Sequence, residues 1–230
     1  MKSKIYLSSL LILTAICGIA CGSQKKPVDC ESNLEKAAYC VNNYYFNTTP
    51  QSLDSALVYL NEIKNRCPEY ENVLNLRLVQ VYYLKGEFKK AVKILKNNDF
   101  GENPDYPGLK NIWINQIQAK EARINGKQDL EQKYYSNIIS ALEKHLDMHK
   151  ELRDSMLTLD DYWAMDNELI TIRTVFSETY YYKMRLYGKQ RTFKELDSIR
   201  QALNGNEYYF ESLKKSLEGK DGHSISIMFD

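Results

Sequence analysis

Two histidines four residues apart are the side chains of this sequence best spaced to hold a metal ion. His145 and His149 share one face of a predicted helix, and Glu143 and Asp147 stand beside them. Helical zinc motifs use this spacing, but the protease version places a glutamate directly after the first histidine. Here Leu146 occupies that position. We therefore interpret the segment as a solvated, charged helix face and predict no metal site.

No other group of reactive side chains matches a catalytic motif. The sequence has no Gly-x-Ser-x-Gly motif, no phosphate-binding loop, no dinucleotide fingerprint and no Cys/His signature. Asp160 and Asp161 form an acidic pair, which we attribute to a helix that begins there, because negative charge stabilises a helix N-terminus. The sequence therefore predicts a protein that is not an enzyme and binds no cofactor.

The N-terminus predicts a covalent modification at Cys21. Lys2 and Lys4 precede an apolar run over residues 5–20, which is short for a membrane span and has the proportions of a signal peptide. The run ends in Gly-Ile-Ala-Cys, which resembles the lipobox of bacterial lipoproteins. The resemblance implies cleavage before Cys21 and stable anchoring through several acyl chains on that residue. The alternative is an ordinary secretory signal followed by a coincidental cysteine.

The lipoprotein resemblance also implies a location. Residues 1–20 would be the signal peptide, and residues 21–31 would be the lipidated N-terminus and a linker. Some Gram-negative groups mark surface-exported lipoproteins with acidic residues directly after the cysteine, whereas residues 22–26 are polar and basic here. We therefore expect an outer-membrane lipoprotein that faces the periplasm.

Three further cysteines follow the proposed anchor. An oxidising compartment favours one disulfide and one remaining thiol among Cys30, Cys40 and Cys67. Helices are predicted over about 33–46 and from Pro50, with Thr49 as the N-cap, and they would form an antiparallel hairpin. Residues equidistant from the turn of a hairpin lie side by side. This geometry predicts a Cys30–Cys67 disulfide and leaves Cys40 as a small buried apolar side chain.

The composition indicates a helical protein. The chain has 230 residues, of which 43% are hydrophobic and 27% charged, so that it can bury a core. It contains only 10 glycines and 5 prolines, which leaves long segments without helix breakers. The net charge is +1 with both signs interspersed, which provides no basic face for nucleic acid. We predict an all-α fold and no nucleic-acid partner.

A single glycine interrupts one of the clearest helical patterns. The pattern stops at Gly86 and resumes two residues later, at Phe88. Glycine adopts positive φ without steric cost, and it therefore ends one helix and turns the chain into the next. The segment predicts two antiparallel helices that are joined by a tight turn.

The same segment carries a repeat motif. Leu78, Tyr82 and Ala91 match the pattern W-x2-L-G-x2-Y followed by A-x3-F, and this hairpin resembles a tetratricopeptide repeat. Ala56 precedes Ala91 by 35 residues, close to the 34-residue period of that family. The resemblance covers about residues 53–104. It implies stacked helical hairpins, because one hairpin cannot bury its apolar face alone.

Beyond residue 104 the alternation of helix and glycine persists without the spacing of the repeat. Further helices are predicted over 109–124, 130–148, about 193–203 and 208–217, and Thr158 and Asp161 together form a capping-box-like start for a long helix that ends at Tyr187. The expected fold is a solenoid of stacked antiparallel hairpins over residues 32–218, with about eight to nine helices and a flexible tail at 219–230. The rival architecture is an irregular bundle that contains one repeat-like hairpin.

The family resemblance also implies a function. In tetratricopeptide repeats the first helices line a concave groove, and five residues of this chain take those positions: Val73, Leu76, Gln80, Tyr83 and Leu84. Such an apolar, tyrosine-bearing groove fits an extended or helical segment, unless the same residues pack against the next hairpin. We therefore expect a protein-interaction scaffold with an envelope protein as partner. The alternative is a glycan- or nutrient-binding outer-membrane lipoprotein, a class that also contains such repeats.

Overall fold

The computed structural model describes residues 28–64, 66–100, 108–160 and 165–219, and their fold is entirely helical. Ten α-helices and one short 3-10 helix lie within these ranges, which contain no strand. The all-α prediction is therefore confirmed, with more helices than the expected eight or nine. The proposed signal peptide, the lipidation site and the C-terminal tail from residue 220 lie outside the described residues.

The N-terminal half consists of two helical hairpins. Its elements are α2 (Cys30–Asn47), α3 (Pro50–Ile63), the 3-10 helix η1 (Pro68–Tyr70), α4 (Glu71–Leu84) and α5 (Phe88–Asn97).

Local chemistry explains where these helices begin and end. The Asp29 carboxylate accepts a hydrogen bond from the Ser32 backbone N–H at 3.0 Å, and this cap starts α2 earlier than the expected residue 33. Thr49 is the N-cap of α3 and Pro50 its first residue, as predicted. Gly86 has φ = 73° and links α4 to α5, which confirms the tight turn that the glycine predicts.

The C-terminal half contains the remaining six helices. They are α6 (Leu109–Ile124), α7 (Gln128–Met148), α8 (Lys150–Thr158), α9 (Asn167–Tyr187), α10 (Lys189–Leu203) and α11 (Glu207–Glu218).

Helix α8 is absent from the sequence prediction, and the predicted capping-box start of the next helix at Thr158 is wrong. Thr158 ends α8, and α9 begins at Asn167, where the Asp166 side chain accepts from the Leu169 N–H at 2.9 Å. A residue far along the chain holds the end of α8 through two hydrogen bonds. Asn206 donates its backbone N–H to the Leu157 carbonyl and its side-chain amide to the Leu159 carbonyl.

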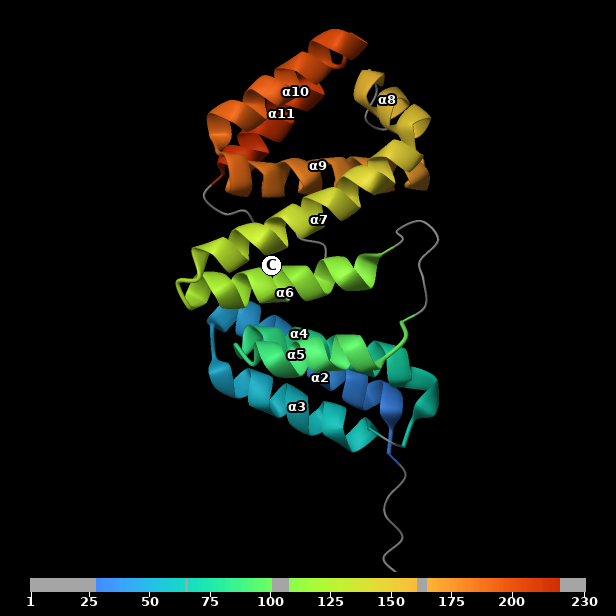
Figure 1. Cartoon of the computed structure of the whole chain (residues 1–230). Helices are drawn as coiled ribbons and strands as arrows, with labels where there is room; N and C mark the ends of the chain where they lie inside the picture. The colour runs from blue at the N-terminus through green and yellow to red at the C-terminus, as the bar shows by residue number, and fades with distance from the viewer. Residues whose placement is uncertain (1–27, 65, 101–107, 161–164, 220–230) are drawn as a thin grey trace, which may run out of the picture.

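The helices pack largely in chain order, so that Figure 1 shows α2 and α3 at one end of the molecule and α10 and α11 at the other. The exception is α8, which lies beside α9 and α10, while α7 packs directly against α9.

Three hydrophobic clusters follow one another along this row of helices. We call them the N-terminal cluster (α2–α4), the middle cluster (α4–α6) and the C-terminal cluster (α6–α11). Tyr82 and Ile94 contact both the N-terminal and the middle cluster, and Leu109 contacts both the middle and the C-terminal cluster. The repeat-motif residues Leu78 and Ala91 are buried in the N-terminal and middle clusters, respectively. Each helix therefore buries its apolar face mainly against the neighbouring helices in the row.

Candidate functional site

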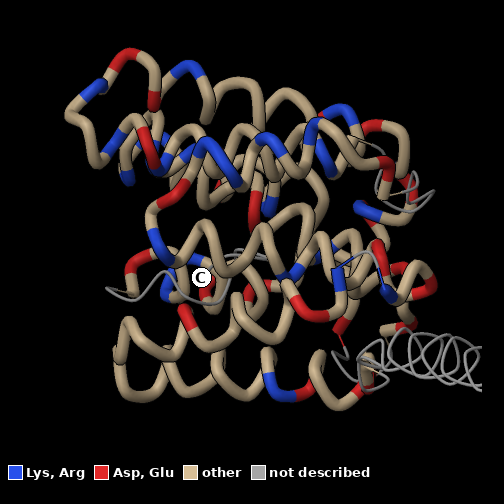
Figure 2. The backbone as a smooth tube through the Cα atoms, turned by 90° about the horizontal axis from the view of Figure 1, so that it is seen from below, with Lys and Arg blue, Asp and Glu red and all other residues tan. Residues whose placement is uncertain are grey.

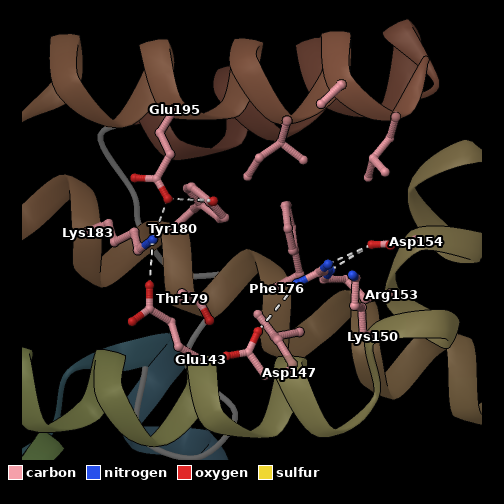
Figure 3. Close-up of a pocket in the computed structure, with 14 residues that line it drawn as sticks. Glu143, Asp147, Lys150, Arg153, Asp154, Phe176, Thr179, Tyr180, Lys183 and Glu195 are labelled. Carbon is pink, nitrogen blue, oxygen red and sulfur yellow. Dashed lines mark hydrogen bonds and ion pairs between the residues drawn. The ribbon is translucent and has the colours of Figure 1, made fainter.

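A cavity of about 560 Å³ lies between α7, α8, α9 and α10 (Figure 3). Its volume falls in the range of small-molecule binding sites. Five apolar side chains line it: Leu146, Phe176, Ile199, Ala202 and Leu203. Two charged groups, which lie on either side of Phe176 in Figure 3, complete the lining together with Lys150 and Thr179.

The first charged group, the Lys183 cluster, consists of Lys183, Glu143, Glu195 and Tyr180. The Lys183 ammonium lies 2.7 Å from a Glu143 oxygen and 2.5 Å from a Glu195 oxygen. The Tyr180 hydroxyl donates to the same Glu195 oxygen at 3.0 Å. This cluster thus joins α7, α9 and α10, each of which supplies at least one member.

The electrostatics of the Lys183 cluster favour the protonated, charged form of Lys183. Burial acts to lower the pKa of Lys183, but the hydrogen bonds and charges of Glu143 and Glu195 outweigh burial, and the pKa is raised above its ordinary value. Burial and the adjacent Glu195 charge also raise the pKa of Tyr180. At neutral pH the lysine is therefore protonated and the tyrosine is neutral.

The second charged group, the Arg153 cluster, consists of Arg153, Asp147 and Asp154. Arg153 donates to one Asp154 oxygen from Nε at 2.9 Å and from Nη2 at 2.8 Å. Its Nη1 lies 3.7 Å from Asp147, whose side chain is 79% exposed. Lys150 lines the cavity next to this cluster, is exposed and forms no ion pair with any residue that the structure describes.

The five residues of the predicted groove do not share one environment. Val73 is 48% exposed, whereas Leu76 and Tyr83 pack against the middle cluster that contains Trp113 of α6. The other two, Gln80 and Leu84, are half-buried; Gln80 accepts a hydrogen bond from Arg77 at 3.0 Å, and Leu84 packs on the N-terminal cluster. The Tyr83 ring lies 5.8 Å from that of Phe88 in its own hairpin. Leu76 and Tyr83 thus pack on the cluster that joins this hairpin to α6, which favours the alternative that the sequence left open.

The histidine pair does not lie on a solvated face, and that interpretation is wrong. His145 is 2% exposed, and its ring centre lies 4.6 Å from that of His149. Both line a small cavity of about 180 Å³ with Leu152 of α8 and Ile172 of α9. Helix α9, against which α7 packs directly, and α8, which the sequence prediction did not contain, supply these neighbours.

The cysteines adopt the predicted pairing. Cys30 and Cys67 form a disulfide with Cα atoms 6.3 Å apart, which ties the start of α2 to the residue before η1. Cys40 has a free thiol, but it is half-buried rather than buried, and burial raises the pKa of this thiol. Within the described residues, the group of three potential metal ligands is Cys30, Cys67 and Glu69, and the disulfide occupies both of its sulfurs.

Surface charge and hydropathy add two observations. Basic and acidic residues are interspersed along the helices in the view of Figure 2, in keeping with the net charge of +1. Within the ranges that the structure describes, every helix is too short or too polar to cross a membrane.

Comparison of the chain with protein-family models, with curated proteins and with solved structures finds no match. Sequence reasoning missed the cavity, although one signal was present. Lys183 follows Phe176 and Tyr180 at helical spacing on the core-facing side of α9. A lysine on such a face requires a carboxylate partner from another helix, and this requirement points to the Lys183 cluster.

Proposed function

We propose that the protein is a non-catalytic interaction scaffold that a lipidated Cys21 anchors to the bacterial envelope. The main support for this proposal is the protonation state of the ionisable groups at the cavity. Catalytic acids and bases have pKa values near the working pH, whereas the pKa values of Lys183 and Tyr180 are both raised away from neutrality. The Lys183 cluster therefore suits a fixed binding surface better than proton transfer.

The arrangement of the helices supports the same proposal. A row in which each hairpin stacks on the next resembles tetratricopeptide arrays, which present long surfaces to other proteins. The pairing of α2 with α3, of α4 with α5 and of α6 with α7 is compatible with such stacking. The four helices around the cavity provide a recessed part of the surface on which a partner can dock.

The exposed aromatic side chains give less support to a glycan-binding function. Three aromatic side chains are exposed on α2 (Tyr39, Tyr45 and Phe46), one on α9 (Tyr187) and one on α11 (Tyr208). In Figure 1, α2 lies towards the opposite end of the molecule from α9 and α11, whereas a sugar platform gathers its aromatic rings on one surface. We therefore prefer a protein partner over a polysaccharide.

Chemical crosslinking in intact cells tests the scaffold proposal. An affinity-tagged protein is crosslinked in envelopes of the source bacterium, purified and analysed for bound protein and polysaccharide. We expect the wild-type protein to recover a defined protein complex and the Cys21→Ala variant, which lacks the anchor, to recover much less of it. Recovery of polysaccharide without protein would instead support the glycan-binding alternative.

A further inference from the structure

One side of α2 is uncovered and aromatic. The most exposed large apolar side chains of the described residues are Phe46 (87%), Tyr208 (82%) and Tyr39 (72%), and two of these three belong to α2. Tyr39 and Phe46 are seven residues, or nearly two helical turns, apart, so that they lie on the same side of the helix. Ala37, on the opposite side, is buried in the N-terminal cluster. We call the side that carries Tyr39, Asn42 and Phe46 the aromatic face of α2.

The part of the chain that carries the aromatic face is uncharged. Residues 37–53, which include the second half of α2 and the first turn of α3, contain no charged side chain, although 27% of the chain is charged. Surfaces that face water are normally rich in lysine, arginine, aspartate and glutamate. Exposed aromatic rings in an uncharged segment instead match the membrane–water interface, where such rings lie at the level of the lipid headgroups. The composition therefore fits contact with lipid.

The proposed anchor lies close to the aromatic face along the chain. Eight residues separate Cys21 from Cys30, which is the first residue of α2. A chain of that length spans at most about 32 Å. Its far end is fixed on the folded protein, because Cys30 is bonded to Cys67. Acyl chains on Cys21 would therefore keep α2 near the bilayer, and at the resulting high local concentration even a weak surface contact forms.

We propose that the aromatic face of α2 lies on the lipid bilayer, with Tyr39 and Phe46 in the headgroup region. A bilayer suits this face better than a second copy of the chain does. Two aromatic rings bury about 300–500 Å² together, whereas a stable dimer buries about 800 Å² on each partner.

The proposal rests on the lipid anchor of the proposed function and adds an orientation to it. In Figure 1 the helices α7–α10, which line the large cavity, lie towards the other end of the row from α2. With α2 on the bilayer, the cavity therefore stays within reach of a partner protein.

Site-directed spin labelling tests this orientation. In the full-length lipidated protein with Cys40→Ala, the change Asn42→Cys supplies a single free thiol for a nitroxide on the aromatic face. The protein is reconstituted into vesicles of phosphatidylethanolamine and phosphatidylglycerol. Electron paramagnetic resonance then measures how often the label collides with oxygen, which is enriched in lipid, and with a water-soluble nickel complex.

A label at the other end of the row provides the reference. Ser212 is exposed on α11, and Ser212→Cys takes the same nitroxide. We expect the ratio of oxygen to nickel collisions to be at least about threefold higher for Asn42→Cys than for Ser212→Cys, because an interfacial helix face lies about 5–10 Å into the lipid.

Removal of the rings shows whether they make the contact. Tyr39→Ser combined with Phe46→Ser should lower the ratio of the Asn42→Cys label to that of the reference label, and the fold should be kept because both side chains are exposed. Tyr208→Ser is the matched control, since it removes a similarly exposed ring from α11 and should leave the ratio unchanged.

Three results would overturn the proposal. The two labels could give the same ratio, or the loss of both rings could leave the ratio of the Asn42→Cys label unchanged. Spin–spin broadening between Asn42→Cys labels on different molecules would assign the aromatic face to a second copy of the chain instead.

Mass spectrometry and vesicle flotation of the wild-type protein keep this orientation distinct from the proposed function. If the protein carries acyl chains and floats with vesicles while the two labels give equal ratios, the anchor stands and only the orientation fails. If Cys21 carries no acyl chain, the anchored scaffold itself fails and the orientation fails with it.

Discussion

At the scale of single residues, the buried tyrosines make the stability of the folded protein depend on pH in the alkaline range. The Tyr209 ring lies against Phe176 and Phe210 in the C-terminal cluster, and burial raises the pKa of its hydroxyl to about 12. In an unfolded chain the hydroxyl ionises near pH 10. Between about pH 10 and 12 the folded state therefore holds a proton that the unfolded state has lost, and the free energy of unfolding falls as the pH rises.

A conservative substitution isolates this contribution. Tyr209→Phe keeps the ring and removes the ionisable group, so that the decline in the free energy of unfolding above pH 10 should become shallower by up to about 1.4 kcal/mol per pH unit. Urea unfolding from pH 8 to 11.5 measures the decline. Tyr208→Phe is the matched control, because Tyr208 is 82% exposed. Equal declines in wild type and Tyr209→Phe would contradict the buried, protonated hydroxyl.

At the scale of helices, the turn at Gly86 depends on backbone conformation alone. Its φ of 73° is strained for other residues, yet a Cβ atom added there would meet no heavy atom within 4 Å. Gly86→Ala should therefore destabilise the protein by about 1–2 kcal/mol through backbone strain without a steric clash. Gly86→Asn should cost less, because asparagine tolerates the left-handed conformation. Chemical denaturation compares the two, and equal losses would point to a side-chain contact instead.

The sequence predicted those helices whose signals are local. Pro50 and Gly86 mark a helix start and a helix end by their own backbone preferences, and both positions are confirmed. The Cys30–Cys67 pairing followed from one hairpin turn that lies between them. Each of these predictions required only residues that are close in the chain or related by a single turn.

Features that depend on distant residues escaped the sequence analysis. Helix α8 has only nine residues and two buried side chains, and Asn206, far along the chain, hydrogen-bonds its end. Its periodicity is therefore too short to recognise. The cavity was missed for the same reason, because Lys150 and Arg153 belong to α8 and Lys183 meets its partners only after α7, α9 and α10 have packed.

At the scale of the whole molecule, packing in chain order should confine a local disturbance. The disulfide closes a loop with a sequence separation of 37 residues, for which the chain-entropy model gives about 4 kcal/mol of stabilisation. Because α2 packs mainly against α3, and more weakly against α4, reduction should loosen these helices and leave α9 protected. Hydrogen exchange followed by mass spectrometry, with and without reductant, compares the segments.

A matched variant controls for the remaining thiol. Cys40→Ala removes it and should give the same pattern, since Cys40 is not part of the disulfide. Faster exchange throughout α7–α10 on reduction would show instead that the row of helices unfolds as one cooperative unit.

The half-buried Cys40 has a practical consequence. It lies in the middle of α2, it packs against the N-terminal cluster, and its raised pKa keeps the reactive thiolate scarce while the first hairpin is closed. We therefore expect an alkylating dye to react with Cys40 more slowly in the folded protein than in the unfolded chain. The ratio of the two rates measures how far the packing of α2 protects this thiol, without an engineered label.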